Sequence, residues 1–92
     1  MENNTYERGR SKESLRAKYT MAVAVILTGV EAHRIRRYEG AGIIEPARTE
    51  AGQRLFCDTE LVIIKEAFRL GAKGINIEGI KAVMAIKRGE NV

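Results

Sequence analysis

The stretch Leu27–Phe56 constrains the fold more than any other part of the chain, because a glycine turn, a short basic helix and a hairpin signal follow one another there. Gly29 comes after an apolar run and supplies the positive φ that a tight turn between two helices needs. Ile35 and Tyr38 then lie on one face of a helix expected over 31–40, which also carries several arginines. We therefore expect a helix-turn-helix whose second helix is held by two apolar side chains and is otherwise basic.

A β-hairpin is expected directly after the basic helix. The apolar pair at 43–44 predicts a short strand, and Pro46 then removes a hydrogen-bond donor, which excludes a central position in a sheet. We place the hairpin loop at 47–53, with Gly52 as its turning residue, and the return strand at 54–56. A hairpin that projects from a helical core is called a wing. The basic residues of this wing are Arg48 and Arg54.

The segments on either side predict further helices. Thr20 is a candidate N-cap for a helix over 21–28, which is apolar on nearly all sides and is therefore expected to be buried. Downstream, a helix over 59–70 is ended by glycines, and Asn76 caps a last helix over 77–87. The apolar side chains expected on the inner faces of these two helices are Leu61, Ile64, Phe68, Ile77, Ile80, Val83 and Met84.

The two ends of the chain are expected to lie outside the folded domain, which we place at 19–88. Residues 1–18 are polar and mixed in charge, with one or two helical turns predicted over 12–17. This segment is interpreted as a tail; the alternatives are a basic arm that touches phosphates and an element that helps two copies associate. Residues 89–92 form a short C-terminal tail.

Length and composition allow one small domain and exclude several classes of function. The 92 residues carry 16 Lys and Arg against 12 Asp and Glu, a net charge of +4. This excess favours nucleic acid only weakly, so its clustering between Arg34 and Arg54 is more informative than its total. One cysteine and one histidine cannot build a disulfide, a multi-cysteine zinc site or a catalytic constellation, so we expect no cofactor and no enzyme. Because nothing resembles a signal peptide or a membrane span, we expect a cytoplasmic protein without membrane contact.

The basic helix is the candidate site for DNA. A helix anchored on one face, with guanidinium groups on the others, fits the groove of a duplex. His33 and Arg34 are expected to face away from Ile35 and Tyr38, which makes them candidates for contacts with base edges. The alternatives are a solvated charged helix face and, for His33, an exposed residue that contacts nothing.

These residues resemble a known family. A Thr-Gly-Val turn, I-R-R-Y-E, a glycine, I-I-x-P-A-R, G-x-R-L-F, an acidic helix start and G-I-N-I-E-G-I-K occur in the order typical of the MerR family of winged helix-turn-helix transcription regulators. The resemblance covers about 19–86, and the last motif is most similar to the short branch that contains the nitrogen-control and heat-shock repressors. It implies a DNA-binding domain that acts as a dimer on an inverted repeat, with the second helix in the major groove and the wing on the backbone.

The resemblance also implies roles for individual residues. Arg36 and Tyr38 match the helix residues that contact phosphate in the family, and Arg54 matches the arginine of the wing motif. The start of the last helix, near Asn76, matches a region whose backbone amides meet a phosphate. The candidate DNA-contacting residues are therefore His33, Arg34, Arg36, Arg37, Tyr38, Arg48, Gln53, Arg54 and Asn76.

Four departures from the family pattern limit what the resemblance implies. Arg37 stands in place of one member of an aromatic pair, and Glu31 stands where the helix usually opens with Ser, Thr or His. Cys57 replaces a serine before the third helix; we expect a buried, inert thiol there, with an oxidant-sensing thiol of lowered pKa as the alternative. The chain also stops soon after the last predicted helix, so we expect neither the long dimerisation helix nor the effector domain of larger members.

The predicted fold is mainly α, a winged helix-turn-helix with a four-helix core and a small β-hairpin wing. The predicted function is a sequence-specific transcriptional regulator that binds double-stranded DNA as a homodimer, with a regulatory protein as a further candidate partner. Two alternatives stay open. One is a DNA-bending accessory protein of a mobile element that directs recombination, and the other is a protein-interaction module whose basic surface meets an acidic partner.

Overall fold

The computed structural model describes residues 12–87 and residue 89. The elements in this part of the chain are α2 (Lys12–Leu15), α3 (Met21–Thr28), α4 (Ala32–Gly40), β1 (Ala47–Arg48), β2 (Arg54–Leu55), α5 (Asp58–Ala72) and α6 (Ile77–Lys87). The predicted mainly helical fold with a two-stranded hairpin is confirmed. Most of the tail expected over 1–18 and nearly all of that at 89–92 lie outside the described residues. None of the helices between residues 12 and 87 is long and apolar enough to cross a membrane.

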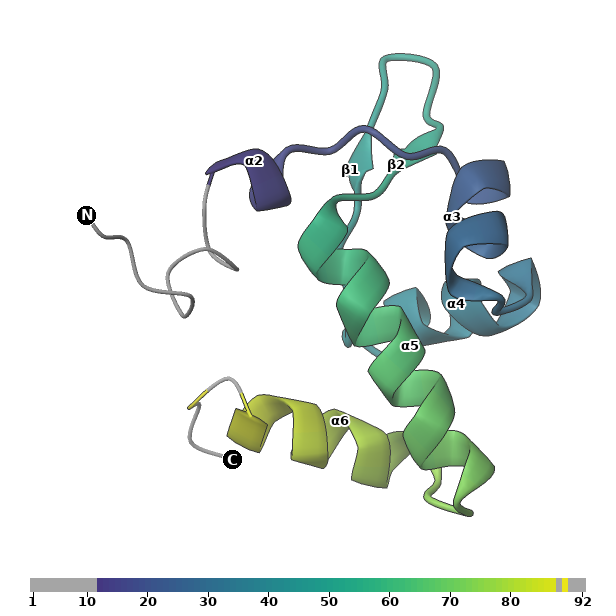
Figure 1. The fold of residues 1–92 in the computed structure, drawn as a ribbon, viewed down its shortest axis with the longest axis vertical. Coiled ribbons are helices and arrows are strands. Elements are labelled where there is room, and N and C mark those ends of the chain that lie inside the picture. Colours follow the sequence, from purple (N-terminus) through teal and green to yellow (C-terminus); the bar gives the residue numbers. More distant parts are fainter. Residues whose placement is uncertain (1–11, 88, 90–92) are drawn as a thin grey trace.

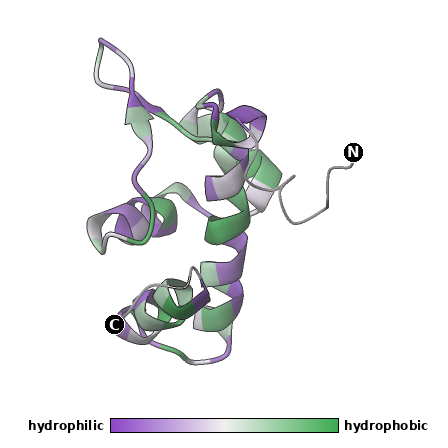
Figure 2. Cartoon of the chain, turned by 90° about the vertical axis from the view of Figure 1, so that its left-hand side faces the viewer, coloured by the Kyte–Doolittle hydropathy of each residue, from purple (hydrophilic) through white to green (hydrophobic). Residues whose placement is uncertain are grey.

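The long helix α5 is the element on which the others pack (Figure 1). The helices α2, α3, α4 and α6 all contact it, with α2 near its first turns and α6 near its last. The β1–β2 hairpin projects away from the helices at the end where α5 begins, as the two views in Figures 1 and 2 show. The wing and the start of α6 therefore lie toward opposite ends of the molecule, with α4 between them.

The helix-turn-helix forms as its local sequence predicts. Thr20 caps α3, because its Oγ1 accepts a hydrogen bond from the N–H of Val23 at 3.3 Å. Gly29 ends α3 in the left-handed conformation at φ 74°, and its N–H donates to the carbonyl of Val25. Val30 then turns into the core and α4 begins two residues later. The turn therefore sets the direction of α4.

The core lies between α4, α5 and the segment that leads into α5. Its largest fully buried side chains are Phe56, Ile35, Ile64 and Val30. Ile35 and Tyr38 are confirmed as the buried anchors of the basic helix. The inward positions predicted for the last helix also hold, because Ile80 and Met84 are buried and Ile77 and Val83 pack against the core.

The prediction that the first helix is buried on nearly all sides is wrong. Only Ala24 of α3 is buried, whereas 77% of the surface of Ile26 is exposed and Val23 and Leu27 are also exposed. One face of α3 packs against α4 and α5, and no described element covers the other. Phe68, predicted to be core, is likewise 38% exposed.

The exposure of Phe68 follows from the way the buried face of α5 shifts along the helix. Its buried residues are Leu61, Ile64, Ala67 and Leu70, which are spaced three apart. A row of that spacing winds around an α-helix instead of running straight along it. Because α6 packs near the last turns of α5, the covered face there no longer includes Phe68.

Two predicted boundaries differ in the structure. Ile43 and Ile44 form no strand, because neither pairs with a second strand. Both are buried in the irregular segment between α4 and the wing. The first strand is instead Ala47–Arg48, paired with 54–55 so that Arg48 lies opposite Arg54. The third helix begins at Asp58 and continues through Gly71, so that Gly74, at φ 95°, follows its end.

The segment before α3 is attached to the base of the wing. Tyr19 and Phe56 form an isolated antiparallel bridge, and the N–H of Lys18 also donates to the carbonyl of Phe56. The hydroxyl of Tyr19 donates to Oδ1 of Asp58 at the start of α5. These bonds hold the chain between α2 and α3 against the point where β2 leads into α5.

Replacing Gly29 with Ala tests the backbone conformation of the turn. A Cβ at Gly29 meets no atom within 4 Å, so the expected effect is purely conformational. A left-handed alanine should lower the free energy of unfolding by roughly 1–2 kcal/mol. Gly40→Ala is the matched control: it lies in the last turn of α4 with equally open space and should raise stability by about 0.5–1 kcal/mol. Urea unfolding measures the change in the free energy of unfolding for both variants. Equal changes would contradict the left-handed conformation assigned to Gly29.

A second prediction concerns the acid stability of the contact between α5 and α6. Glu66 accepts hydrogen bonds from Arg69 and from Nζ of Lys87 at 2.8 Å, and these lower the pKa of its carboxyl from 4.5 to about 2. A lowered pKa stabilises the fold above pH 4.5, and this contribution is lost as the pH falls toward 2. Glu66→Gln should therefore flatten the decline of Tm over that interval. Glu50→Gln, in the wing loop and outside every ion pair of residues 12–87, should leave it unchanged.

Candidate nucleic-acid interface

The outward face of α4 is cationic. His33, Arg36 and Arg37 are exposed and lie opposite the buried Ile35 and Tyr38, at the spacing of neighbours on one helix face. Neither Arg36 nor Arg37 forms an ion pair within the described residues. Nδ1 of His33 lies 3.7 Å from Oε1 of Glu31, a pairing that attracts only when the imidazole is protonated. This face therefore presents two uncompensated guanidinium groups.

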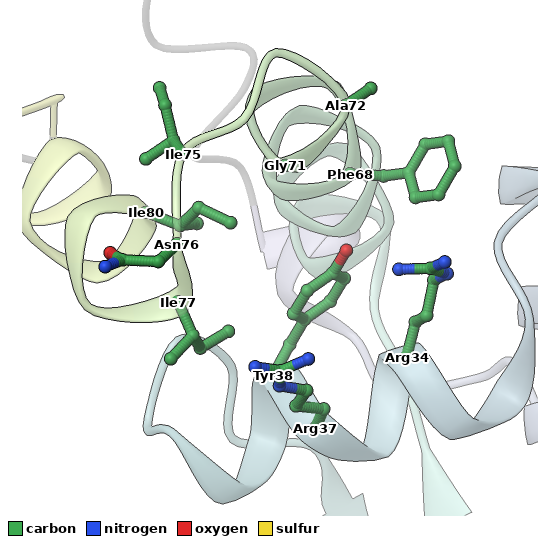
Figure 3. A pocket seen from close by; sticks show the side chains of 10 residues that line it. All are labelled: Arg34, Arg37, Tyr38, Phe68, Gly71, Ala72, Ile75, Asn76, Ile77 and Ile80. Atoms are coloured by element: carbon green, nitrogen blue, oxygen red, sulfur yellow. The ribbon is translucent and has the colours of Figure 1, made fainter.

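Arg34 does not share this face, and the prediction that it points away from Tyr38 is wrong. Its guanidinium carbon lies 5.4 Å from the centre of the Phe68 ring, and Arg34 and Tyr38 line the same cleft (Figure 3). A cation over an aromatic ring is attracted by the negative face of the ring. The partly exposed Phe68 thus holds Arg34 toward α5, away from the outer surface of α4.

A cleft of about 400 Å³ separates α4 from the end of α5 and the start of α6 (Figure 3). Both charged or polar side chains and apolar side chains line it. The residues that line it are Arg34, Arg37, Tyr38, Phe68, Gly71, Ala72, Ile75, Asn76, Ile77 and Ile80. The cleft joins the outward face of α4 to the N-terminus of α6.

The Tyr38 hydroxyl is the unusual group in this cleft. Tyr38 is only 4% exposed, yet within residues 12–87 its hydroxyl has no hydrogen-bond partner. Figure 3 shows this hydroxyl directed between the guanidinium of Arg34 and the last turns of α5. Burial raises the pKa of Tyr38, while the charges of Arg34 and Arg37 act in the opposite direction. A buried hydroxyl without a partner leaves a donor available for an acceptor that enters the cleft.

The N-terminus of α6 forms the far side of the cleft. Asn76 caps it as predicted, because Oδ1 accepts a hydrogen bond from the N–H of Gly79 at 2.8 Å. This bond occupies the side-chain oxygen of Asn76, so an anion at this helix end would meet chiefly backbone amides. A helix N-terminus carries a partial positive charge. This charge adds to the positive charges of Arg34 and Arg37, which line the same cleft.

The predicted wing residues follow a different pattern. Gln53 is exposed in the loop that Gly52 turns at φ 86°, and its N–H donates to Oγ1 of Thr49. Arg48 and Arg54 are both bound to Glu39 in the last turn of α4. The distances are 2.9 Å from Nη2 of Arg48 to Oε2 and 2.5 Å from Nε of Arg54 to Oε1.

Glu39 is the residue that sequence reasoning missed. Burial alone would raise the pKa of its carboxyl, but hydrogen bonds from Arg54 and Arg48, together with their charges, lower it below the usual value. The available signal was a single acidic residue in an arginine-rich helix that precedes a hairpin with two more arginines. Without the fold, nothing indicated that the three residues meet.

Cys57 is buried at the N-cap position of α5, in agreement with the expectation of a buried thiol. Burial raises the pKa of its thiol, although hydrogen bonds from the backbone of Glu60 and Thr59 oppose the rise. This direction is the opposite of the lowered pKa that the alternative, an oxidant-sensing thiol, requires. Among residues 12–87 and 89, no three His, Cys, Asp or Glu side chains are grouped so that they could hold a metal ion.

Comparison with known proteins supplies a family for this geometry. The model of the MerR HTH family regulatory proteins matches residues 19–86. The HTH-type transcriptional regulator GlnR of Bacillus anthracis is 31% identical over 72 residues, which are 78% of this chain and 56% of GlnR. HspR of Streptomyces coelicolor is 27% identical over 70 residues, which are 75% of this chain and 46% of HspR. The chain thus spans about half the length of these relatives.

A solved structure is similar in fold as well as in sequence. HiNmlR, a MerR family regulator lacking the sensor domain, was crystallised bound to promoter DNA. It superposes with a TM-score of 0.65 at 27% identity, over 79% of this chain and 59% of that one. The winged helix-turn-helix arrangement of the described residues agrees with this match.

Two tyrosine variants test whether the Tyr38 hydroxyl lacks a partner in the free protein. Tyr38→Phe removes a buried hydroxyl that makes no hydrogen bond within the described chain, so the free energy of unfolding should not fall and should rise by up to about 1–3 kcal/mol. Tyr19→Phe removes the bond to Asp58 and should lower the unfolding midpoint. Urea titrations compare the two, and a clear loss in Tyr38→Phe would reveal a partner that the structure does not contain.

Proposed function

This chain belongs to the MerR family of helix-turn-helix regulatory proteins, and we propose that it regulates transcription by sequence-specific binding to double-stranded DNA. The observation that carries this proposal is the outward face of α4, where Arg36 and Arg37 are exposed without an ion-pair partner in the described chain. A helix fits the major groove of B-DNA, and free guanidinium groups suit both phosphates and guanine edges.

The position of each residue around α4 supports a division between base and phosphate contacts. Successive residues are rotated by about 100° around a helix axis. His33 therefore lies almost opposite the midline of the buried Ile35 and Tyr38, with Arg36 and Arg37 equally far from that midline on either side of it. We propose that His33 and Arg37 contact base edges. Arg36 lies toward the wing side and Arg34 toward the cleft, so we propose phosphate contacts for both.

The cleft beside α4 suits a backbone phosphate. The Tyr38 hydroxyl has no partner among the described residues, and the Arg34 guanidinium is held beside it by Phe68. The amides at the start of α6 lie across the cleft near Asn76. A phosphate accepts hydrogen bonds from all three kinds of donor, and none of these contacts depends on the base sequence.

The wing gives a second contact with the backbone, and we propose that Arg54 and Gln53 provide it. One domain of this size makes few phosphate contacts, so its affinity for a half-site should be modest. We therefore propose that two copies bind an inverted repeat, with their recognition helices about 34 Å apart. HiNmlR, which has the same fold, was crystallised on promoter DNA, and this supports duplex DNA as the ligand.

The relatives named above favour transcription regulation over the two alternatives and over catalysis. GlnR is named a transcriptional regulator and HiNmlR a regulator. Neither name points to recombination, to a protein-interaction module or to an enzyme. We therefore propose that this chain acts by binding alone and needs no cofactor.

Salt-dependent binding measurements test the proposal. A duplex selected from a random pool and an unrelated duplex are titrated by fluorescence anisotropy at several salt concentrations. Arg36→Ala and Arg54→Ala should weaken binding to both duplexes and reduce the salt slope by about one unit each. Arg37→Ala should instead remove preference at one base position, about 1–3 kcal/mol.

The control is Arg69→Ala, which removes the same charge from the ion pair with Glu66 on α5. It should change neither the affinity nor the slope by more than the general loss of one distant charge. Equal, salt-independent binding of the selected and unrelated duplexes would contradict the proposed function. An unchanged slope in Arg36→Ala would contradict only the assigned face of α4.

A further inference from the structure

Glu39 joins the recognition helix to both strands of the wing. It belongs to α4, whereas Arg48 belongs to β1 and Arg54 lies directly opposite it on β2. Two like charges at opposed positions of a hairpin repel each other. The two oxygens of one carboxylate bind one arginine each, so Glu39 offsets that repulsion and connects the hairpin to α4 at the same point.

The β1–β2 hairpin of the wing is short. Each strand has two residues, and an isolated two-stranded hairpin is at best marginally stable in water. Ala47 and Arg48 are exposed, and the bridge between Tyr19 and Phe56 lies at the base of the hairpin. The Glu39 contacts, by contrast, lie on the hairpin itself. The side-chain hydrogen bonds that join the hairpin to α4 in the described chain therefore converge on a single carboxylate.

The two arginines use different atoms in this arrangement. Arg48 donates from Nη2 to Glu39 and from Nη1 to the carbonyl of Gly52 at 3.0 Å, so the fork of its guanidinium is occupied by the protein. Arg54 donates to Glu39 from Nε, and within the described residues its two terminal nitrogens bind nothing. These terminal nitrogens form the part of a guanidinium that binds a phosphate through two parallel bonds.

We propose that Glu39 is a positioning residue that fixes the wing at a set angle to the recognition helix, with Arg48 as an internal brace and Arg54 as the arginine presented to DNA. The inference rests on the proposed function, because it assigns the wing its contact with a phosphate. In this role Glu39 aids binding although its charge repels DNA, which is the reverse of what its charge alone predicts.

The sign of one substitution tests this. Glu39→Gln removes a negative charge from the interface, so electrostatics alone would tighten binding. If Glu39 positions the wing, binding should instead weaken about tenfold, because an amide nitrogen cannot accept a hydrogen bond from arginine. Glu50→Gln removes the same charge from the exposed wing loop and should not weaken binding. Equal or tighter binding by Glu39→Gln would overturn the proposal.

The salt slope separates the two arginines. Arg54→Ala should reduce the slope by about one unit, because a phosphate contact is lost. Arg48→Ala should weaken binding with the slope unchanged, since only the brace is lost. A slope reduced equally by both substitutions would overturn the division of roles between Arg48 and Arg54.

Amide hydrogen exchange tests the positioning role of Glu39 without DNA. The N–H of Gly52 donates to the carbonyl of Thr49, and the N–H of Gln53 donates to the hydroxyl of Thr49. Exchange at these two amides should accelerate in Glu39→Gln and Arg48→Ala, while the amide of Leu61 in α5 keeps its rate. Acceleration at all three would indicate general destabilisation and overturn the positioning role. If the parent chain bound no duplex at all, the proposed function would fail. This exchange pattern would still show whether Glu39 fixes the wing against α4.

Discussion

The burial of Ile35 and Tyr38 is the interaction on which the rest of this structure depends. The nine-residue helix α4 is too short to be stable alone, and Arg34, Arg36 and Arg37 lie within one turn of it. Like charges at neighbouring helix positions are destabilising by about 0.2–0.5 kcal/mol a pair, whereas a fully buried apolar side chain contributes roughly 1.5–3 kcal/mol. The two anchors therefore outweigh the repulsion, and they also determine which positions face outward. The three arginines can lie close together on α4 only because the opposite side of that helix is buried in the core.

The remaining contact elements are attached to α4 by a few polar and conformational features. Gly29 sets the direction of the helix, Glu39 ties the wing to its last turn, and Asn76 opens α6 across the cleft. Each feature acts over only a few residues, and each fixes a different part of the proposed interface. An interface built in this way is sensitive to single substitutions that leave the hydrophobic core intact. The polar features thus set the geometry of the proposed interface, while the core decides whether the domain folds.

Local features of the fold were predictable from the sequence, and features that depend on distant packing were not. The turn at Gly29, the caps at Thr20 and Asn76 and the anchors of α4 follow from patterns within one element. The orientation of Arg34 depends on Phe68, which lies in another helix and whose exposure depends in turn on where α6 packs. The roles of Glu39 and of the unpartnered Tyr38 hydroxyl likewise require knowledge of the hairpin and of the cleft. Helical periodicity places a residue on a face but does not identify what that face meets.

The position of the one acidic residue within α4 shows how charge and geometry are reconciled. Between Ala32 and Gly40 only Glu39 is acidic, and it lies on the side of the wing instead of the outward face. A carboxylate at an outward position would neutralise the guanidinium groups that we propose to face a duplex. Placed toward the hairpin, the same charge offsets the repulsion between the two wing arginines and still leaves the terminal nitrogens of Arg54 unbound in the described chain. One negative charge therefore holds two basic elements together without reducing the cationic character of the surface they form.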